Sequence, residues 1–303
     1  MKNKKLLAVI CAILVLAILA GIYFLFIRKP AETPAPAATE APAETEAPAE
    51  TEAPAETEAP AADLLSTIKE RGYITIATEG DWAPYTFHDE ANELVGYDVE
   101  IGKEIAAILG VEARFEETNW DSILAGVDSG RFDIACNGVG YNETRAEKYS
   151  FSTPYMVSEM VLVVRIDNDE IKSYEDLKGK KTANTISSNY ATKAQAYGAE
   201  VTGVDALIDT IHLVEQGRVD ATLNADVAIH DYLKEHPDAQ IKIAATQDGE
   251  KCCIPVRKSA EAATLVAAID EALQTLRENG KLAELSKKYF DGMDLTGYTP
   301  AAE

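Results

Sequence analysis

The sequence predicts an α/β protein whose folded part, residues 63–303, is divided into two lobes of like topology. Strand-like and helix-like patterns alternate along this part, which implies mostly parallel sheets with helices packed against them. Gly-Arg-Phe-Asp at residues 130–133 recurs as Gly-Arg-Val-Asp at 217–220, and an Asn follows each copy, at Asn137 and Asn224. The alternative is a recurrent helix-to-strand turn without wider symmetry.

Residues 1–29 have the pattern of an export signal. Three lysines precede an uncharged run from Leu6 to Ile27, which as a helix would measure about 33 Å against about 30 Å of hydrocarbon. The run ends in large side chains and contains no small-x-small cleavage site. We predict an uncleaved signal anchor, with a cleaved signal peptide as the alternative, and the lysines favour a body outside the cytoplasm.

Residues 30–62 are predicted to be a disordered linker. The hexapeptide Ala-Pro-Ala-Glu-Thr-Glu occurs three times in tandem, starting at Ala41, Ala47 and Ala53. Its charges repel one another and it offers no apolar face, so it behaves as an extended spacer. An anchor followed by such a spacer would tether the body to the outer face of the cell membrane.

The elements of the body follow in order. Strands are predicted over 73–78, 111–115, 131–136 and 160–165, from alternating or continuous apolar residues. The early helices start at Asp98, with Gly110 as the stop, and at Asp121, which is the predicted N-cap. Further helices are predicted near 188–197, 205–214 and 225–235, then over a long stretch that ends near Gly280, and last over 282–290.

Composition excludes several classes of protein. The formal net charge of -23 disfavours nucleic-acid binding, which needs a basic face, and four Cys in 303 residues are no disulfide framework. Sequence motifs for a hydrolase elbow, a zinc protease, a phosphate loop or a dinucleotide site are missing. The histidines are scattered, and Cys136, Cys252 and Cys253 sit in apolar segments. We therefore expect no metal, no cofactor and no catalytic residues.

A candidate anion site follows the strand that ends at Cys136. Gly138 and Gly140 let backbone N–H groups approach a ligand, and the guanidinium of Arg145 suits a carboxylate. The alternative is a local pair of Arg145 with Glu143 or Glu147. In the other lobe Ser188 and Asn189 open a helix whose N-terminus would add donors. An ordinary helix cap is the alternative there.

Other candidates lie where strands end, because open α/β sheets bind ligands at that edge. Trp82 and Trp120 are the two Trp of the chain, and both lie near predicted strand ends. Core packing is the alternative for each. Glu79 and Asp226 are acids near the same edges that could receive an ammonium group, although a single acid is more often simply solvated.

These residues resemble the family 3 extracellular solute-binding proteins, the polar amino-acid receptors of bacterial ABC importers. The resemblance covers about residues 64–295, and each of its pieces is weak alone whereas the ordered set is specific. The matching segments are Thr78–Tyr85, Gly96–Glu100, Trp120-Asp121, Gly130–Asp133, Arg145, Phe151–Tyr155, Asp176–Lys180, Gly217–Asp220 and Gly280–Phe290.

The resemblance implies a two-lobed periplasmic-binding-protein-like (type II) fold with two hinge strands and the ligand buried on closure. Lobe 1 would span about 64–157 and 253–303, and lobe 2 about 158–252. Glu79, Trp82 and Trp120 would then line the wall of lobe 1. The segment that holds the α-carboxylate would comprise Asn137, Gly138, Gly140 and Arg145, completed by Ser188 and Asn189.

The chain departs from the family pattern where the ligand's ammonium group is expected. The family commonly has an Asp at the position of Ala225, so here either Asp226 reaches in or Glu79 takes the ammonium. Ser187 also replaces the usual Gly of its loop. The segments around Glu79 and Asn137 look most like the cystine-binding subgroup, and Gly138 in place of the Gln common there should enlarge that corner. Cystine is thus the first expectation, with other polar amino acids close behind.

The predicted function is capture of a polar amino acid for an ABC permease, by a monomer that lies outside the cytoplasm. A cyclohexadienyl-type dehydratase shares this fold and is the enzymatic alternative. A ligand-binding sensor module is the third possibility. The sequence specifies neither the permease nor the affinity.

Overall fold

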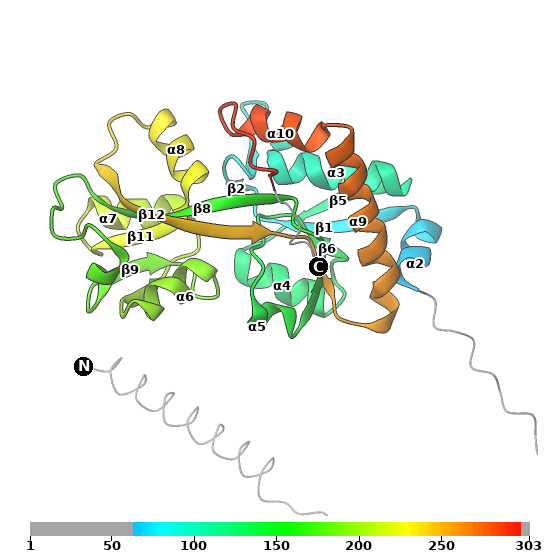
Figure 1. Ribbon diagram of the computed structural model, residues 1–303, viewed down its shortest axis with the longest axis horizontal. Helices are drawn as coiled ribbons and strands as arrows, with labels where there is room; N and C mark the ends of the chain where they lie inside the picture. The colour runs from blue at the N-terminus through cyan, green and yellow to red at the C-terminus, as the bar shows by residue number, and fades with distance from the viewer. Residues whose placement is uncertain (1–62, 298–303) are drawn as a thin grey trace, which may run out of the picture. The chain divides into compact units, whose positions relative to one another are not determined.

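Two mixed β-sheets organise residues 63–297, the residues that this computed structural model describes (Figure 1). We call the residues around the first sheet lobe 1 and those around the second sheet lobe 2. The predicted anchor (1–29) and linker (30–62) lie outside the described residues, as do residues 298–303. None of the helices between residues 63 and 297 combines the length and the apolar character that a membrane crossing requires.

The sheet of lobe 1 has the strand order β5-β1-β6-β13-β7. β1 pairs in parallel with β5 and β6, whereas β13 pairs antiparallel with β6 and β7. The bounds are β1 Tyr73–Thr78, β5 Glu112–Glu117, β6 Ile134–Ala135, β7 Tyr149–Phe151 and β13 Pro255–Arg257. A small antiparallel sheet beside it comprises β2 Asp81–Trp82, β3 Thr86–His88 and β4 Leu94–Val95.

The sheet of lobe 2 has the order β10-β9-β11-β8-β12. Its parallel strands are β9 Lys181–Asn184, β10 Glu200–Gly203 and β11 Ala221–Ala225. β8 Met156–Arg165 pairs antiparallel with both β11 and the edge strand β12 Ile241–Cys252. In both lobes the first parallel strand lies between the second and the third, so the two lobes share one topology.

The Asp of the repeated Gly-Arg-x-Asp segment makes the same type of hydrogen bond in each lobe. One carboxylate oxygen of Asp133 accepts a hydrogen bond from the backbone N–H of Thr75 in β1, at 2.7 Å. One carboxylate oxygen of Asp220 accepts from the backbone N–H of Lys181 in β9, also at 2.7 Å. Each Asp thus ties the start of the third parallel strand to the first strand of its sheet. The repeat therefore reflects the shared topology.

β8 and β12 lie side by side and run in opposite directions between the two lobes (Figure 1). The chain passes from β7 to β8 through residues 152–155 and from β12 to β13 through residues 253–254. Because the chain leaves lobe 1 and returns to it, each sheet contains one strand that runs against the other four, β13 in lobe 1 and β8 in lobe 2. The sheets are therefore mixed, although four of the five strands in each run in one direction, as strand–helix alternation predicts for a mostly parallel sheet.

Helices cover both sheets, and two of them form much of the lobe 1 core. α3 and α9 bury stripes at helical spacing that include Ile101, Ile105, Ile269 and Leu273. The helices of lobe 1 are α2 Leu64–Arg71, α3 Tyr97–Leu109, α4 Trp120–Asp128, α5 Glu143–Ala146, α9 Ala263–Glu278 and α10 Lys281–Tyr289. Those of lobe 2 are α6 Asn189–Ala196, α7 Leu207–Glu215 and α8 Asp226–Glu235, and short 3₁₀ helices cover Tyr174–Leu177 and Ala260–Ala262.

Some predicted boundaries are wrong for local reasons. The N-cap of α4 is Asn119, whose side-chain oxygen accepts from the N–H of Ser122 at 3.1 Å, so Asp121 lies in the first turn. The strand predicted over 160–165 begins earlier, at Met156, because β8 continues back toward lobe 1. The strand predicted over 131–136 is reduced to Ile134–Ala135, since its first residues belong to the turn.

Candidate functional site: a cleft between the lobes

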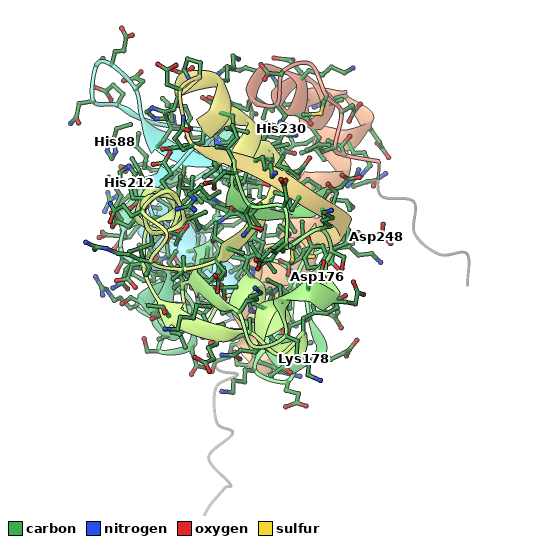
Figure 2. All side chains as sticks on the ribbon, turned by 90° about the vertical axis from the view of Figure 1, so that its left-hand side faces the viewer. His88, Asp176, Lys178, His212, His230 and Asp248 are labelled. Atoms are coloured by element: carbon green, nitrogen blue, oxygen red, sulfur yellow. The ribbon has the colours of Figure 1, made fainter. Side chains whose placement is uncertain are left out.

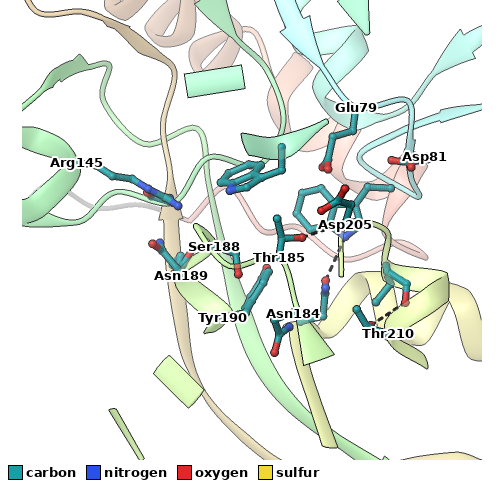
Figure 3. A pocket seen from close by; sticks show the side chains of 17 residues that line it. Glu79, Asp81, Arg145, Asn184, Thr185, Ser188, Asn189, Tyr190, Asp205 and Thr210 are labelled. Carbon is teal, nitrogen blue, oxygen red and sulfur yellow. Dashed lines mark hydrogen bonds between the residues drawn. The ribbon is translucent and has the colours of Figure 1, made fainter. Parts of the chain in front are cut away.

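Polar side chains from both lobes converge on a cavity between them (Figure 3). Loops that follow the parallel strands supply much of this lining, as the edge rule for open α/β sheets anticipates. The lining residues are Glu79, Asp81, Trp82, Trp120, Gly138, Gly140, Arg145, Asn184, Thr185, Ser188, Asn189, Tyr190, Asp205, Leu207, Thr210, Asn224 and Glu250.

Arg145 provides the cation at one end of the cavity. Asn142 caps the short helix α5, and its side-chain oxygen accepts from the N–H of Arg145 at 2.7 Å. The guanidinium is buried, lies 5.2 Å from the ring of Trp120, and donates to the carbonyl oxygens of Gly140 (2.8 Å) and Ser187 (3.2 Å). Burial lowers the pKa of Arg145 without removing its charge at neutral pH. The alternative, an ion pair of Arg145 with Glu143 or Glu147, is therefore wrong, because the guanidinium donates to these two carbonyl oxygens instead.

The start of helix α6 faces Arg145 from lobe 2. Ser188 is its N-cap and accepts from the N–H of Ala191 at 3.0 Å, so this predicted helix start is where the structure places it. The Asn189 side-chain oxygen accepts from the side-chain amide of Asn142 at 2.7 Å, which links the lobes. A helix N-terminus beside a guanidinium is a favourable environment for a carboxylate.

The other end of the cavity is acidic. Figure 3 shows Glu79, Asp81 and Asp205 on the side away from Arg145, Ser188 and Asn189. The pKa of Glu79 is raised to about 7, mainly by burial; a hydrogen bond from the side-chain amide of Asn137 at 2.7 Å opposes the rise, and the charges of Asp81 and Asp205 contribute to it. Burial likewise raises the pKa of Asp81, with smaller contributions from nearby acids. A positively charged group would relieve this repulsion.

The two Trp form part of the wall, as predicted for their position. Trp82 stacks on Tyr85, with ring centroids 4.1 Å apart and planes 9° apart, and its indole N–H donates to the side-chain oxygen of Asn224 across the lobes at 3.1 Å. The ring of Trp82 also lies against Gly138, where a Cβ would come within 2.7 Å of it. The corner beside Gly138 is therefore filled by indole, contrary to the expectation that Gly enlarges it.

Within residues 63–297, two polar atoms of the lining are buried and have no hydrogen-bond partner. They are the indole N–H of Trp120 and the side-chain oxygen of Asn184. Buried polar groups are nearly always paired in native proteins. The two atoms are thus exceptions to this rule among the lining residues.

Asp98 holds the glycine loop from behind. Its carboxylate accepts from the N–H of Gly138 at 2.9 Å and from the hydroxyl of Tyr155 at 2.5 Å. Burial raises the pKa of Asp98 to about 6, and both hydrogen bonds lower it. This contact fixes the loop that carries Gly140 toward Arg145.

The predicted site residues do not all meet in the cavity. Glu79, Trp82, Trp120, Gly138, Gly140, Arg145, Ser188 and Asn189 line it. Asn137 lies behind Glu79, where its side-chain oxygen also accepts from the Glu79 N–H at 2.8 Å. Asp226 lies outside the lining and accepts from the hydroxyl of Ser158 at 3.2 Å.

Sequence reasoning missed other lining residues, among them Asp81, Tyr190, Asp205 and Glu250. Asp205 follows the carboxyl end of β10, so the strand-end rule could have found it. Glu250 lies inside the antiparallel strand β12, where that rule gives no signal. The four histidines are exposed, among them His88, His212 and His230 (Figure 2), and residues 63–297 contain no group of three His, Cys, Asp or Glu suited to a metal ion.

Comparison with known proteins shows which protein family this chain resembles. Residues 74–292 match the bacterial extracellular solute-binding proteins, family 3. The L-cystine-binding protein TcyA of Bacillus subtilis is 40% identical over 230 residues, which are 75% of this chain and 85% of TcyA. A probable amino-acid ABC transporter-binding protein of Haemophilus influenzae is 37% identical over 236 residues, covering 78% of this chain and 91% of that protein.

Solved structures extend the similarity to the arrangement of the lobes. An ancestral arginine-binding protein bound to arginine has a TM-score of 0.68 at 33% identity, covering 73% of this chain and 99% of that one. The L-cystine solute receptor of Neisseria gonorrhoeae, unliganded and open, has a TM-score of only 0.53 at 40% identity, over 77% of this chain and 99% of that one. The liganded structure is the better match, in keeping with the direct hydrogen bonds between the lobes here.

Proposed function

Because the chain belongs to the bacterial extracellular solute-binding proteins of family 3, we propose that its cleft captures L-cystine, or failing that another polar amino acid with a distal cation. The chain is the substrate-binding component of an amino-acid ABC transporter, and it acts outside the cytoplasm. Delivery of the ligand to a membrane permease follows from that role. We propose that it does so as a monomer and without catalysing a reaction.

The charge distribution of the cavity carries this proposal. Arg145 and the start of α6 suit an α-carboxylate, while Glu79, Asp81 and Asp205 suit a positive group at the far end. L-Cystine has an amino-acid head at both ends and so presents a second ammonium group there. With its raised pKa, Glu79 is partly protonated near pH 7 and can donate a hydrogen bond to the second carboxylate.

A basic amino acid is the second candidate, and the same acidic end favours it. L-Arginine carries a carboxylate and a distal guanidinium, and three carboxylates can pair with that guanidinium. The similarity to an arginine-bound structure supports keeping this candidate. It differs from L-cystine in leaving no second carboxylate at the acidic end.

Calorimetric titration of the full chain in detergent with L-cystine, L-arginine and the other amino acids tests the proposal. Saturable binding of L-cystine at least about tenfold tighter than that of L-arginine, a difference of about 1.4 kcal/mol, supports cystine. The reverse order supports a basic amino acid. Absence of binding by all of them refutes an amino-acid receptor. Turnover of prephenate or arogenate, followed by ultraviolet absorbance, would instead indicate a dehydratase.

We further propose that residues 1–29 are retained as an anchor and that residues 30–62 are the tether. The long apolar run, the absence of a cleavage motif and the charged repeat support this. Expressed in a bacterial host, the full chain should sediment with membranes and keep its N-terminus. A mature N-terminus inside residues 30–62 would show that the segment is cleaved.

A further inference from the structure

The group that accepts the ligand's α-ammonium is not settled by the sequence, which left Asp226 and Glu79 as candidates. Asp226 is the first residue of α8, and its carboxylate is engaged by Ser158, which in turn accepts from the hydroxyl of Tyr85 at 3.2 Å. Asp226 therefore faces this buried hydroxyl pair and not the cavity. Glu79 lies at the end of the cavity away from Arg145 (Figure 3).

The covalent structure of an amino acid restricts where the acceptor can be. The ammonium and the carboxylate are attached to the same carbon atom, so an acceptor for the ammonium must lie beside the cation that binds the carboxylate. If the carboxylate is held by Arg145, the acceptor must be a neighbour of Arg145. This requirement excludes the acidic end of the cavity.

Glu250 meets the requirement. It lines the cavity, and its carboxylate lies against Gly140, in the space that a Cβ at residue 140 would need. Gly140 is also the residue whose carbonyl oxygen accepts from Arg145. The carboxylate of Glu250 interacts with the charge of Arg145 and accepts a hydrogen bond from the side chain of Asn189. It thus borders the same loop and the same helix start as the carboxylate site.

The guanidinium of Arg145 directs its hydrogen bonds to other acceptors than the carboxylate of Glu250. Both hydrogen bonds that its guanidinium donates within the described part of the chain go to backbone carbonyl oxygens. Burial raises the pKa of Glu250, while Arg145 and Asn189 lower it. A bound ammonium group would add a further stabilising partner for the ionised form.

β12 has two register shifts against β8, and Glu250 directly follows the second of them, a β-bulge. Gln247 pairs with Met160 and Glu250 with Ser158, so β12 advances three residues where β8 advances two. An extra residue reverses which side chains point to each face, and bulges commonly re-aim a side chain in this way. Gly249 fits the bulge because a Cβ there would overlap the carbonyl group of Ser158, and Asp248 projects outward from it (Figure 2).

We propose that Glu250 accepts the α-ammonium group of the amino acid whose carboxylate Arg145 binds, and so replaces in this chain the Asp that the family commonly has at the position of Ala225. The proposal rests on the proposed function, since it presupposes an amino-acid ligand. It assigns the recognition of the zwitterionic head to a hinge strand, in addition to the loops at the strand ends.

The test compares two ligands on one variant. L-Cystine and 3,3′-dithiodipropionate have the same carboxylates and disulfide, but the second lacks both ammonium groups. In Glu250→Gln, which keeps the shape and the acceptor for Asn189, L-cystine should bind about 10- to 100-fold more weakly, the scale of a hydrogen bond to a charged group. Dithiodipropionate should bind equally or more tightly, because a repelling carboxylate is gone. A merely structural role would weaken both ligands.

Asp226→Asn is the matched control, and it should leave the preference for L-cystine within about threefold of that of the wild type. The proposal is overturned if a folded Glu250→Gln binds L-cystine as the wild type does, if it loses both ligands equally, or if Asp226→Asn shows the loss instead. If Glu250→Gln does not fold, Glu250→Asp is tested in its place. It must reduce the preference for L-cystine over dithiodipropionate in the same direction, by a smaller factor, and an unchanged preference also overturns the proposal.

The outcome for the wild type separates this proposal from the proposed function. If the wild type binds none of the amino acids, the proposed function fails before Glu250 is tested. If it binds L-arginine and not L-cystine, L-arginine and 5-guanidinopentanoate form the matched pair, and the same pattern is expected. If the wild type binds an amino acid, and Glu250→Gln does not weaken that ligand while sparing its analogue without the ammonium group, only the role of Glu250 fails.

Discussion

Replacing Arg145 by Ala should greatly weaken binding of the amino acid and leave the protein folded. The guanidinium is buried, with 8% of the residue exposed, so its charge is poorly screened in the closed cleft. Removing one member of a buried hydrogen-bonded charge pair costs about 2–5 kcal/mol, which corresponds to a Kd raised from about 30-fold to about 5,000-fold. The hydrogen bond to Ser187 joins the two lobes, so its loss adds to the effect on closure.

The effect on stability should be smaller. Among the described contacts of Arg145, the hydrogen bond to Gly140 lies within lobe 1, and the loss of one such bond costs about 1–3 kcal/mol. For a body of this size that corresponds to a decrease in Tm of roughly 2–10 °C, which thermal unfolding followed by circular dichroism can measure. Arg145→Lys keeps the charge but not the planar fork, and it should bind with intermediate affinity.

Arg114→Ala is the control for the loss of one positive charge. Arg114 lies on β5 and pairs with Glu112 at 2.9 Å, and both side chains are exposed. Exposed pairs contribute little, so both affinity and Tm should stay close to those of the wild type. If a folded Arg145→Ala binds within about threefold of the wild type in calorimetry, the carboxylate is bound elsewhere and the assignment of the cavity's ends is wrong.

Two further predictions concern the acidic end and the Trp residues. Burial raises the pKa of Glu79 from its usual 4.5 to about 7 in the folded protein, so the folded state binds the extra proton and Glu79 destabilises it progressively as the pH rises from about 4.5 through 7. Relative to the wild type, the free energy of unfolding of Glu79→Gln should therefore rise by up to about 3 kcal/mol between pH 5 and pH 8. If denaturant titrations give the same difference between variant and wild type at both pH values, the prediction is contradicted. Trp82 and Trp120 are the chain's two Trp and both line the cavity, so amino-acid binding should change the fluorescence saturably, and Trp82→Phe and Trp120→Phe should each remove part of the change. Calorimetric binding with a flat emission would contradict that prediction.

The sequence predicted the features that depend on local order along the chain. Helices and strands appear in the expected succession, because their periodicity and their glycine stops act over a few residues. The two copies of Gly-Arg-x-Asp predicted the shared topology of the lobes, since each Asp ties neighbouring strands in the same manner. Arg145, Gly138 and Gly140 could be singled out because they follow a strand end directly.

Features that depend on pairing between distant strands were missed or misplaced. Glu250 could not be singled out, because its pairing with Ser158 depends on two register shifts between β12 and β8, and strand register cannot be predicted from one segment alone. Asp226 was one of two candidates for the ammonium group, beside Glu79, but in the first turn of α8 its carboxylate accepts a hydrogen bond from Ser158. The filled corner beside Gly138 likewise results from the stacking of Trp82 on Tyr85.

The hydrogen bonds between the lobes explain why binding and closure belong together. Asn142 reaches Asn189, Arg145 reaches Ser187, Asp121 also pairs with Ser187, and Trp82 reaches Asn224. All four join lobe 1 to lobe 2, and three of them gather around the carboxylate end of the cavity. A carboxylate bound by Arg145 in an open molecule lacks the donors of α6, which only closure brings to it. On the proposed site, we therefore expect the amino-acid head to be the part of the ligand that drives closure, and the acidic end to select among side chains.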